Sequence, residues 1–112
     1  MYNLLKDVRA FHRKFNHAIE DKDPSPELLA FRRALVREEA HELRDALTRL
    51  QLRNSPENLR EVAREAADLI YVAVGTCIAV GAPLTEAWDE VHMANMRKIP
   101  AKHPLLKPTK VA

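Results

Sequence analysis

Apolar residues recur along the chain with a helical period and divide it into helical segments. Positions three or four residues apart begin near Leu4 and predict a first helix that ends at about Ile19. The triplet Ser25-Pro26-Glu27 combines a serine N-cap, a proline in the first turn and an acidic residue. It predicts the start of a second helix, which runs to about Arg53 with an apolar stripe formed by Leu28, Phe31, Leu35, Leu43, Ala46 and Leu50.

The same start signal returns at residues 55–57 and opens a third helix, which runs from Pro56 to about Val80. Gly81 is placed to cap the end of this helix. Gly75 lies inside it, at a cost of roughly 1 kcal/mol relative to alanine. Close approach of another helix and simple tolerance both explain a glycine there. A fourth helix begins near residues 83–85 and runs to about Lys98.

The four helices predict one all-α domain over residues 1–99, folded as an antiparallel four-helix bundle. Pro100, Pro104 and Pro108 make residues 100–112 an irregular tail. The chain has 112 residues and only 2 glycines, too few for the turns of an all-β sandwich or barrel. A domain this short buries a modest share of its surface, which favours completion of the fold by oligomerisation.

The net charge of +2 hides an uneven distribution. Residues 97–112 hold five basic residues and no acidic one, whereas residues 1–96 hold 13 basic and 16 acidic residues. The tail is interpreted mainly as a solvated segment, and no stable nucleic-acid complex is expected. Charged residues near the N-terminus argue against a signal peptide, and the uncharged stretch 69–85 is too short to span a membrane. We therefore expect a cytoplasmic protein without membrane contact.

Three glutamates of the second helix fall inside its apolar stripe. On a helical wheel with Glu38 at zero, Glu42 lies at about 40° and Glu39 at about 100°. The stripe residues Phe31 to Leu50 span about 20° to 120° on the same wheel. Carboxylates that face a core are costly without a cation. On the third helix, Glu65 and Asp68 are neighbours on one face.

If the two helices pack antiparallel, these five carboxylates converge. One interpretation is a set of ion pairs with the arginines nearby in sequence, which are Arg37, Arg44, Arg60 and Arg64. The other is a divalent cation, since clustered carboxylate oxygens are the ligands that Mg²⁺ prefers and Mn²⁺ accepts. The overlap of the acids with the core favours the cation.

The acidic motifs resemble those of a known superfamily. Glu38-Glu39-x-x-Glu42, followed after 22 residues by Glu65-x-x-Asp68, is similar to the signature of the MazG-type all-α nucleoside triphosphate pyrophosphohydrolases. Dimeric dUTPases and phosphoribosyl-ATP pyrophosphohydrolase belong to the same superfamily. Asn95-Met96-Arg97-Lys98 is similar to its closing element, and the resemblance covers about residues 4–99.

The resemblance implies a MazG-like bundle that hydrolyses a nucleoside triphosphate to the monophosphate and pyrophosphate with Mg²⁺. It implies that Glu38, Glu39, Glu42, Glu65 and Asp68 bind the metal and carry out catalysis. Asn95 and Lys98 match residues that contact the substrate phosphates. It also implies a homo-oligomer, either a dimer or a dimer of dimers, and the uncharged segment 69–84 is the candidate contact surface.

Three further residues are candidates for binding the base or ribose. Phe11 and Trp88 have rings that could stack on a base, although single aromatic residues more often belong to a core. His12 is a third candidate, and an exposed position on the helix surface is favoured for it. No pattern in the sequence identifies the base or the sugar.

Two alternatives compete with the hydrolase. Glu38-x-x-His41 and Asp89-x-x-His92 have the spacing of a di-iron carboxylate bundle. This site would leave Glu39, Glu42 and the acids of the third helix without a role, and His41 lies away from the stripe. The second alternative is a non-catalytic helical oligomer for protein interaction, whose acids are surface charge.

Overall fold

The computed structural model describes residues 2–99, which form four helices and no strand. These are α1 (Tyr2–Lys14), α2 (Pro26–Leu52), α3 (Pro56–Val80) and α4 (Leu84–Met96). The predicted all-α class with four helices is confirmed. The predicted tail at 100–112 lies outside the described residues. None of the described helices is both long and apolar enough to cross a membrane.

The chain forms two compact units. The first contains α1, α2 and α3 and ends at Ala82, and the second begins at Pro83 and contains α4. Helix α4 buries none of its side chains.

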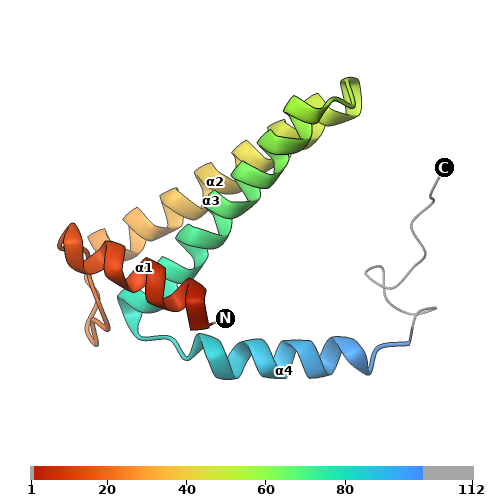
Figure 1. Cartoon of the computed structure of the whole chain (residues 1–112). Helices are drawn as coiled ribbons and strands as arrows, with labels where there is room; N and C mark the ends of the chain where they lie inside the picture. The colour runs from red at the N-terminus through yellow and green to blue at the C-terminus, as the bar shows by residue number, and fades with distance from the viewer. Residues whose placement is uncertain (1, 100–112) are drawn as a thin grey trace. The chain divides into compact units, whose positions relative to one another are not determined.

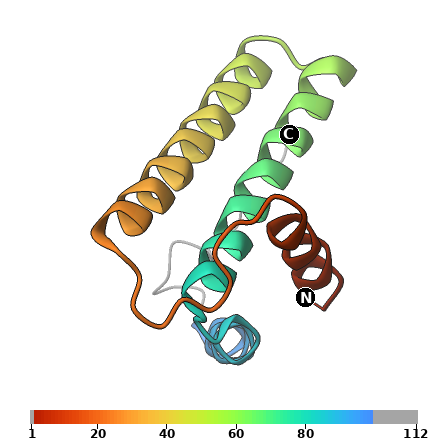
Figure 2. The same cartoon turned by 90° about the vertical axis from the view of Figure 1, so that its left-hand side faces the viewer.

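Helices α2 and α3 form a long antiparallel hairpin (Figures 1 and 2). Both predicted start signals act as N-caps, because Ser25 Oγ accepts from Leu28 N at 3.0 Å and Ser55 Oγ accepts from Asn58 N at 3.1 Å. The Asn58 side chain also donates to the Arg53 carbonyl at 2.8 Å. The hairpin turn therefore satisfies backbone groups at the ends of both helices.

Helix α1 packs against α3 and is shorter than the sequence predicts. It ends at Lys14, whereas the apolar spacing continues to Ile19. The chain leaves the helix because Asn16 adopts a left-handed conformation (φ 57°). His17 N then donates back to the His12 carbonyl at 2.8 Å and Asn16 N to the Arg13 carbonyl at 3.4 Å, which is a Schellman end.

The loop after α1 covers the C-terminal end of α3. The backbone N–H groups of Glu20 and Asp21 donate to the carbonyls of Ile78 and Ala79, at 2.7 and 2.8 Å. Gly81 caps the same end in the left-handed conformation (φ 70°), as the sequence predicts. These contacts fix α1 and its loop on the open end of the hairpin.

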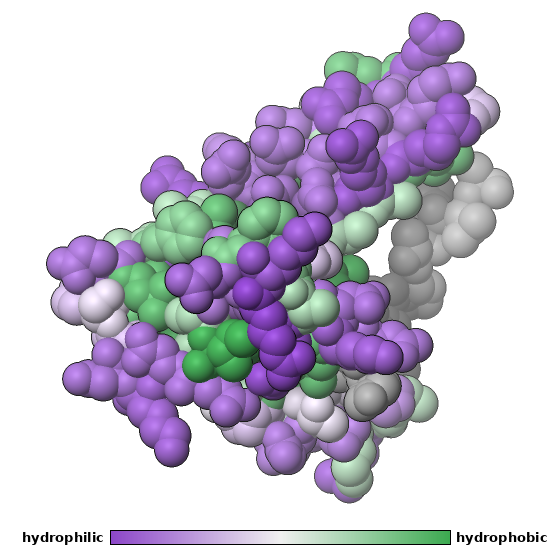
Figure 3. Space-filling model, turned by 60° about the vertical axis from the view of Figure 1, so that its left-hand side comes forward, coloured by the Kyte–Doolittle hydropathy of each residue, from purple (hydrophilic) through white to green (hydrophobic). Residues whose placement is uncertain are grey.

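The apolar core is small, and its members lie on all three helices of the first unit. The fully buried apolar residues are Val8, Ala46, Val74, Ile78 and Ala79. Large apolar side chains remain exposed on α2 and α3, among them Leu29, Leu47, Leu59 and Ile70. Figure 3 shows apolar side chains gathered at the end of the hairpin that carries α1 and hydrophilic ones along the rest.

Candidate metal centre

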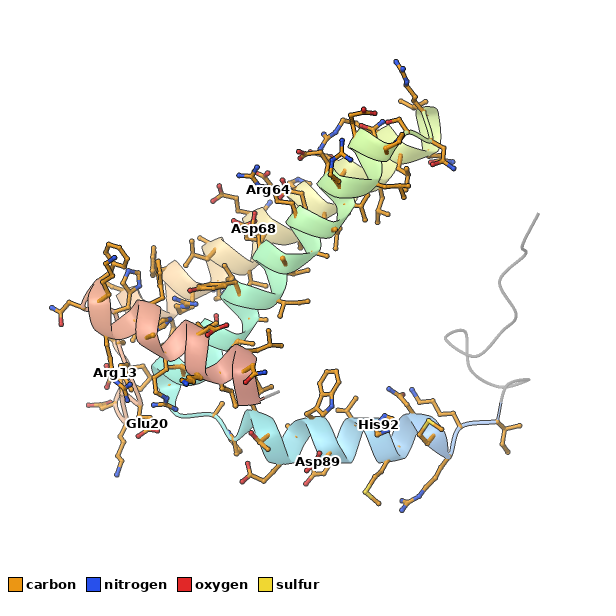
Figure 4. All side chains as sticks on the ribbon, in the orientation of Figure 1. Arg13, Glu20, Arg64, Asp68, Asp89 and His92 are labelled. Atoms are coloured by element: carbon orange, nitrogen blue, oxygen red, sulfur yellow. The ribbon has the colours of Figure 1, made fainter. Side chains whose placement is uncertain are left out.

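Three carboxylates meet across the hairpin. Glu39 projects from α2, and Glu65 and Asp68 project from α3, with one oxygen of each within 4.8 Å of the others. Glu65 and Asp68 share one face of α3 because they are three residues apart. Figure 4 shows Asp68 on α3, one turn from Arg64. Three of the five acids that the sequence singles out therefore come together.

Glu38 and Glu42 lie outside this three-carboxylate cluster, and both are exposed. They are nevertheless close enough to act on it electrically. Glu42 raises the pKa of both Glu39 and Glu65, and Glu38 raises that of Glu39. All five acids thus contribute to one negatively charged region. Only Glu39, Glu65 and Asp68 place their carboxylate oxygens close together.

Glu65 is the least exposed member of the cluster. Only 9% of its surface is exposed, and its Oε2 atom is buried without a hydrogen-bond partner. Desolvation, followed by the charges of Glu42 and Asp68, raises the pKa of Glu65 above its ordinary value. Desolvation, followed by the charge of Asp68, raises the pKa of Glu39 as well. The fold holds these acids where their charged forms are costly.

No basic residue of the first unit compensates this negative charge. Two ion pairs occur within residues 2–82, Arg9 with Glu20 at 3.5 Å and Arg60 with Glu57 at 3.9 Å, and neither includes the cluster. Arg64 only lowers the pKa of Glu65 weakly, as the smallest of several effects. The ion-pair interpretation of the five acids is therefore not supported by the described contacts.

The arrangement suits a hard divalent cation. Carboxylate oxygens are the donors that Mg²⁺ and Mn²⁺ prefer, and a bound cation would satisfy the buried Glu65 Oε2 atom. Glu39, Glu65 and Asp68 are the residues that could hold it directly. The cluster contains no histidine. Glu38 and His41, the first half of the di-iron pattern, are both exposed and lie outside it, while Asp89 and His92 belong to α4 (Figure 4).

A second polar group lies toward the open end of the hairpin, and the sequence does not predict it. Arg32 of α2 is only 5% exposed. Its Nε donates to Thr76 Oγ1 at 3.1 Å and its Nη2 to the Val72 carbonyl at 3.0 Å, both on α3. The sequence feature that could have indicated Arg32 is its spacing from Glu39. Arg32 precedes Glu39 by seven residues, or two helical turns, so both residues lie on one face of α2.

His12 is buried beside Arg32, with 2% of its surface exposed, so the exposed position favoured for it is wrong. Its Nδ1 donates to the Ala18 carbonyl at 2.8 Å, across the Schellman end of α1. Burial, and after it the charge of Arg32, lowers the pKa of His12 despite this hydrogen bond. The contact of His12 with a base or ribose stays a prediction.

The remaining candidates lie on surfaces. Phe11 is partly exposed and packs edge-to-face on Tyr71, with ring centroids 5.5 Å apart. Trp88 and Asn95 lie on α4, and Lys98 follows that helix. Because these three belong to the second unit, their contacts with a substrate stay predictions.

Fold and site together define an all-α protein with a carboxylate cluster between two antiparallel helices. The family model of phosphoribosyl-ATP pyrophosphohydrolase matches residues 8–95. The chain belongs to this family, which is part of the MazG-like all-α nucleoside triphosphate pyrophosphohydrolase superfamily and is metal-dependent in general. It is a nucleotide pyrophosphohydrolase. A comparison with curated proteins gives no match.

Proposed function

We propose that this protein hydrolyses a nucleoside triphosphate, with ribose or deoxyribose, to the monophosphate and pyrophosphate in the presence of Mg²⁺. The observation that carries the proposal is the buried, unpartnered Glu65 Oε2 atom within a cluster of three carboxylates. A polyphosphate brings further negative charge to this region, so both sides require a cation. Family membership favours this chemistry over a non-catalytic interaction module.

Each carboxylate has a proposed task. Glu39, Glu65 and Asp68 hold the metal, and Glu38 and Glu42 extend the negative region around it. A bound Mg²⁺ would neutralise phosphate oxygens and lower the pKa of a water molecule. Because metal ligands must be deprotonated, the raised pKa values of Glu39 and Glu65 make metal binding stronger as the pH rises.

The hydrolysis itself needs a base near the attacked phosphorus, which we propose to be the α-phosphorus. The water oxygen forms a bond to phosphorus, the bond to the pyrophosphate oxygen breaks, and the water proton passes to a carboxylate. Glu39 and Glu42 are the two candidates for this proton, because both belong to the negative region. We further propose that Asn95 and Lys98 contact the phosphates, since a lysine supplies charge-assisted hydrogen bonds. Phe11 and Trp88 are proposed to stack on the base.

We also propose that a second copy of the chain completes the fold, as a dimer or a dimer of dimers. The buried apolar core is small, and large apolar residues of α2 and α3 remain exposed. Two-fold association is the commonest way to cover such a surface. A monomer at micromolar concentration in light scattering would contradict this proposal.

We propose a cytoplasmic location for the protein, with which a nucleotide substrate and a single cysteine are consistent.

The test is a pyrophosphate-release screen over canonical and modified NTPs and dNTPs, with Mg²⁺ or Mn²⁺. We expect release from at least one nucleotide, and loss of release when the metal is chelated. The Asp45→Asn variant is the control, because Asp45 is an exposed acid on the same helix as Glu39. No release from any nucleotide by folded protein in the presence of metal would refute the proposal.

A further inference from the structure

Arg32 carries a buried positive charge that the first unit does not neutralise. Within residues 2–82 no carboxylate pairs with it, and its two hydrogen bonds go to the neutral oxygens of Thr76 and Val72. Burying a charged group without a counter-charge is costly. A side chain that is 95% buried yet unpaired is therefore suited to receive an acceptor from outside the unit.

The guanidinium has a free edge. It carries five N–H donors, and its hydrogen bonds to Thr76 and Val72 occupy the Nε donor and one Nη2 donor. The second Nη2 donor and both Nη1 donors have no partner among residues 2–82. Together they form a planar fork, which matches two adjacent acceptor atoms.

The surroundings hold this fork in place. Thr76 Oγ1 donates to the Val72 carbonyl at 2.8 Å, which fixes the oxygen that accepts from Arg32. Gly75 leaves the necessary space, since a Cβ atom there would lie 2.7 Å from Arg32 Nη2 and 2.8 Å from His12 Nε2. The arginine is thus positioned before any ligand binds.

Its position relates Arg32 to the carboxylate cluster. Arg32 precedes Glu39 by seven residues on α2, which is about 10 Å along the helix. Thr76 follows Asp68 by eight residues on α3, or about 12 Å. Arg32 and Thr76 line an open groove of about 1020 Å³ that also contains Glu38, whereas Glu39, Glu65 and Asp68 are not among its lining residues. A nucleotide whose phosphates lie at the cluster, and whose other end runs along the hairpin toward Arg32, would reach this groove.

We infer that Arg32 is a substrate-binding residue, which receives two acceptor atoms at the end of the nucleotide remote from the hydrolysed phosphate. The inference rests on the proposed function. Two sources supply such a pair: the O6 and N7 atoms of guanine, or two oxygens of a further phosphate group. Adenine presents N7 beside an amino donor and does not match the fork.

The test compares KM and kcat of wild type and Arg32→Lys for GTP, ATP and an ATP that carries an additional phosphate on its ribose. Arg32→Lys keeps the charge and removes the fork. If guanine is the source, KM for GTP rises roughly tenfold or more with little change in kcat, and the two adenine substrates respond little. If a phosphate is the source, only the substrate with the ribose phosphate responds. Arg44→Lys, an exposed arginine of α2, is the matched control and leaves all values unchanged.

A second variant tests the inference independently, in case Arg32→Lys does not fold. Gly75→Ala retains Arg32 but displaces its guanidinium, and we expect the same substrate-selective rise in KM. Wild type gives a third readout, because it must prefer GTP or the ribose-phosphorylated ATP over ATP in KM. Thermal shifts with GMP, with AMP and with an AMP that carries the additional ribose phosphate test the same preference without turnover.

The failure of this inference differs from that of the proposed function. Equal KM changes for all three substrates, or no preference in wild type, overturn the role of Arg32 while pyrophosphate release persists. Dissociation of an oligomer by Arg32→Lys without a change in KM also overturns it, since the acceptor then belongs to a second copy. Absence of all pyrophosphate release refutes the hydrolysis, and the thermal shifts with monophosphates still decide on Arg32.

Discussion

The α2–α3 hairpin holds two charged groups of opposite sign two turns apart and leaves them unpaired. The carboxylate cluster brings Glu39, Glu65 and Asp68 together across the helices, and neither ion pair among residues 2–82 includes them. Arg32 lies between the same two helices and donates hydrogen bonds only to neutral oxygens of α3. Elsewhere the chain does pair unlike charges, as Arg9 and Glu20 show.

The difference between the groups lies in how each is satisfied. Carboxylates that face one another repel, so the acidic group lacks a counter-charge within the first unit. The packing of α2 against α3 holds the three carboxylates together despite this repulsion. Arg32 is fixed by hydrogen bonds and by the space over Gly75, so the basic group is rigid but electrically unbalanced. If Arg32 formed salt bridges with the carboxylates, these charges would serve only to stabilise the hairpin. Their separation instead suits a ligand that is anionic at the cation-bound end and rich in acceptors at the other.

The largest expected effect is on catalysis at the acidic group. Glu39→Gln and Glu65→Gln each remove a proposed metal ligand, and we expect pyrophosphate release to fall at least about a hundredfold. Even partners that only orient metal ligands cost about 10–100-fold when they are removed. The measurement is kcat/KM under saturating Mg²⁺, with Asp45→Asn as control. Activity within a few-fold of wild type would show that the cluster is not the metal site.

The next effect is on stability with and without metal. A site that binds Mg²⁺ only in the folded state stabilises it by about 2.7 kcal/mol when free Mg²⁺ is about a hundredfold above its Kd. We expect Glu65→Gln to abolish this gain, and to make the metal-free protein more stable than wild type by removing one of the repelling charges. Thermal unfolding of both proteins with Mg²⁺ and with chelator measures the reversal. Equal responses to Mg²⁺ would contradict it.

The stability of the metal-free protein should depend on pH in a direction that the raised pKa values set. The pKa values of Glu39 and Glu65 are raised above the ordinary 4.5, so the folded protein holds their protons longer than the unfolded chain does. Their contribution to stability is present below pH 4.5 and is lost as the pH rises through the raised values. Glu65→Gln should flatten this part of the profile.

A smaller effect is expected at the basic group. Gly75→Ala places a Cβ atom against Arg32 and His12, and such overpacking costs about 1–3 kcal/mol. The better helix propensity of alanine returns about 1 kcal/mol, which leaves a modest net loss. Urea unfolding measures it, and the loss should shrink in an Arg32→Ala background, where one of the two contacts is gone. An unchanged or increased stability of Gly75→Ala alone would show that the space is not required.

Much of the fold follows from local signals in the sequence. The two Ser-Pro-Glu triplets and Gly81 set helix boundaries because the caps act through neighbouring backbone atoms. The end of α1 does not follow from periodicity, since Asn16 breaks the helix while the apolar spacing continues beyond it. The placement of exposed apolar residues on α2 and α3 depends on a core that no local pattern describes.

The site is predictable to a similar extent. A helical wheel brings acids toward α3, but the choice of Glu39 over Glu38 and Glu42 depends on how the two helices rotate against each other. His12 and Arg32 were harder to predict, because only the tertiary contact at Gly75 reveals that both are buried. A buried arginine resembles a surface arginine in sequence unless its spacing from the acidic motif is considered.

The smallest expected effect at neutral pH comes from His12. Burial, with the charges of Arg32, His17 and Arg9, lowers the pKa of His12 below 6.5. The unfolded chain therefore takes up this proton first, so the contribution of His12 to stability is present above pH 6.5 and is lost as the pH falls through the lowered value. The sign is opposite to that of Glu39 and Glu65. We expect His12→Gln to lessen the loss of unfolding free energy on acidification, measured as the difference from wild type, whereas His41→Gln, at an exposed position of α2, should not. Parallel pH profiles for wild type and His12→Gln would show that the enclosure of His12 beside Arg32 has no electrostatic consequence.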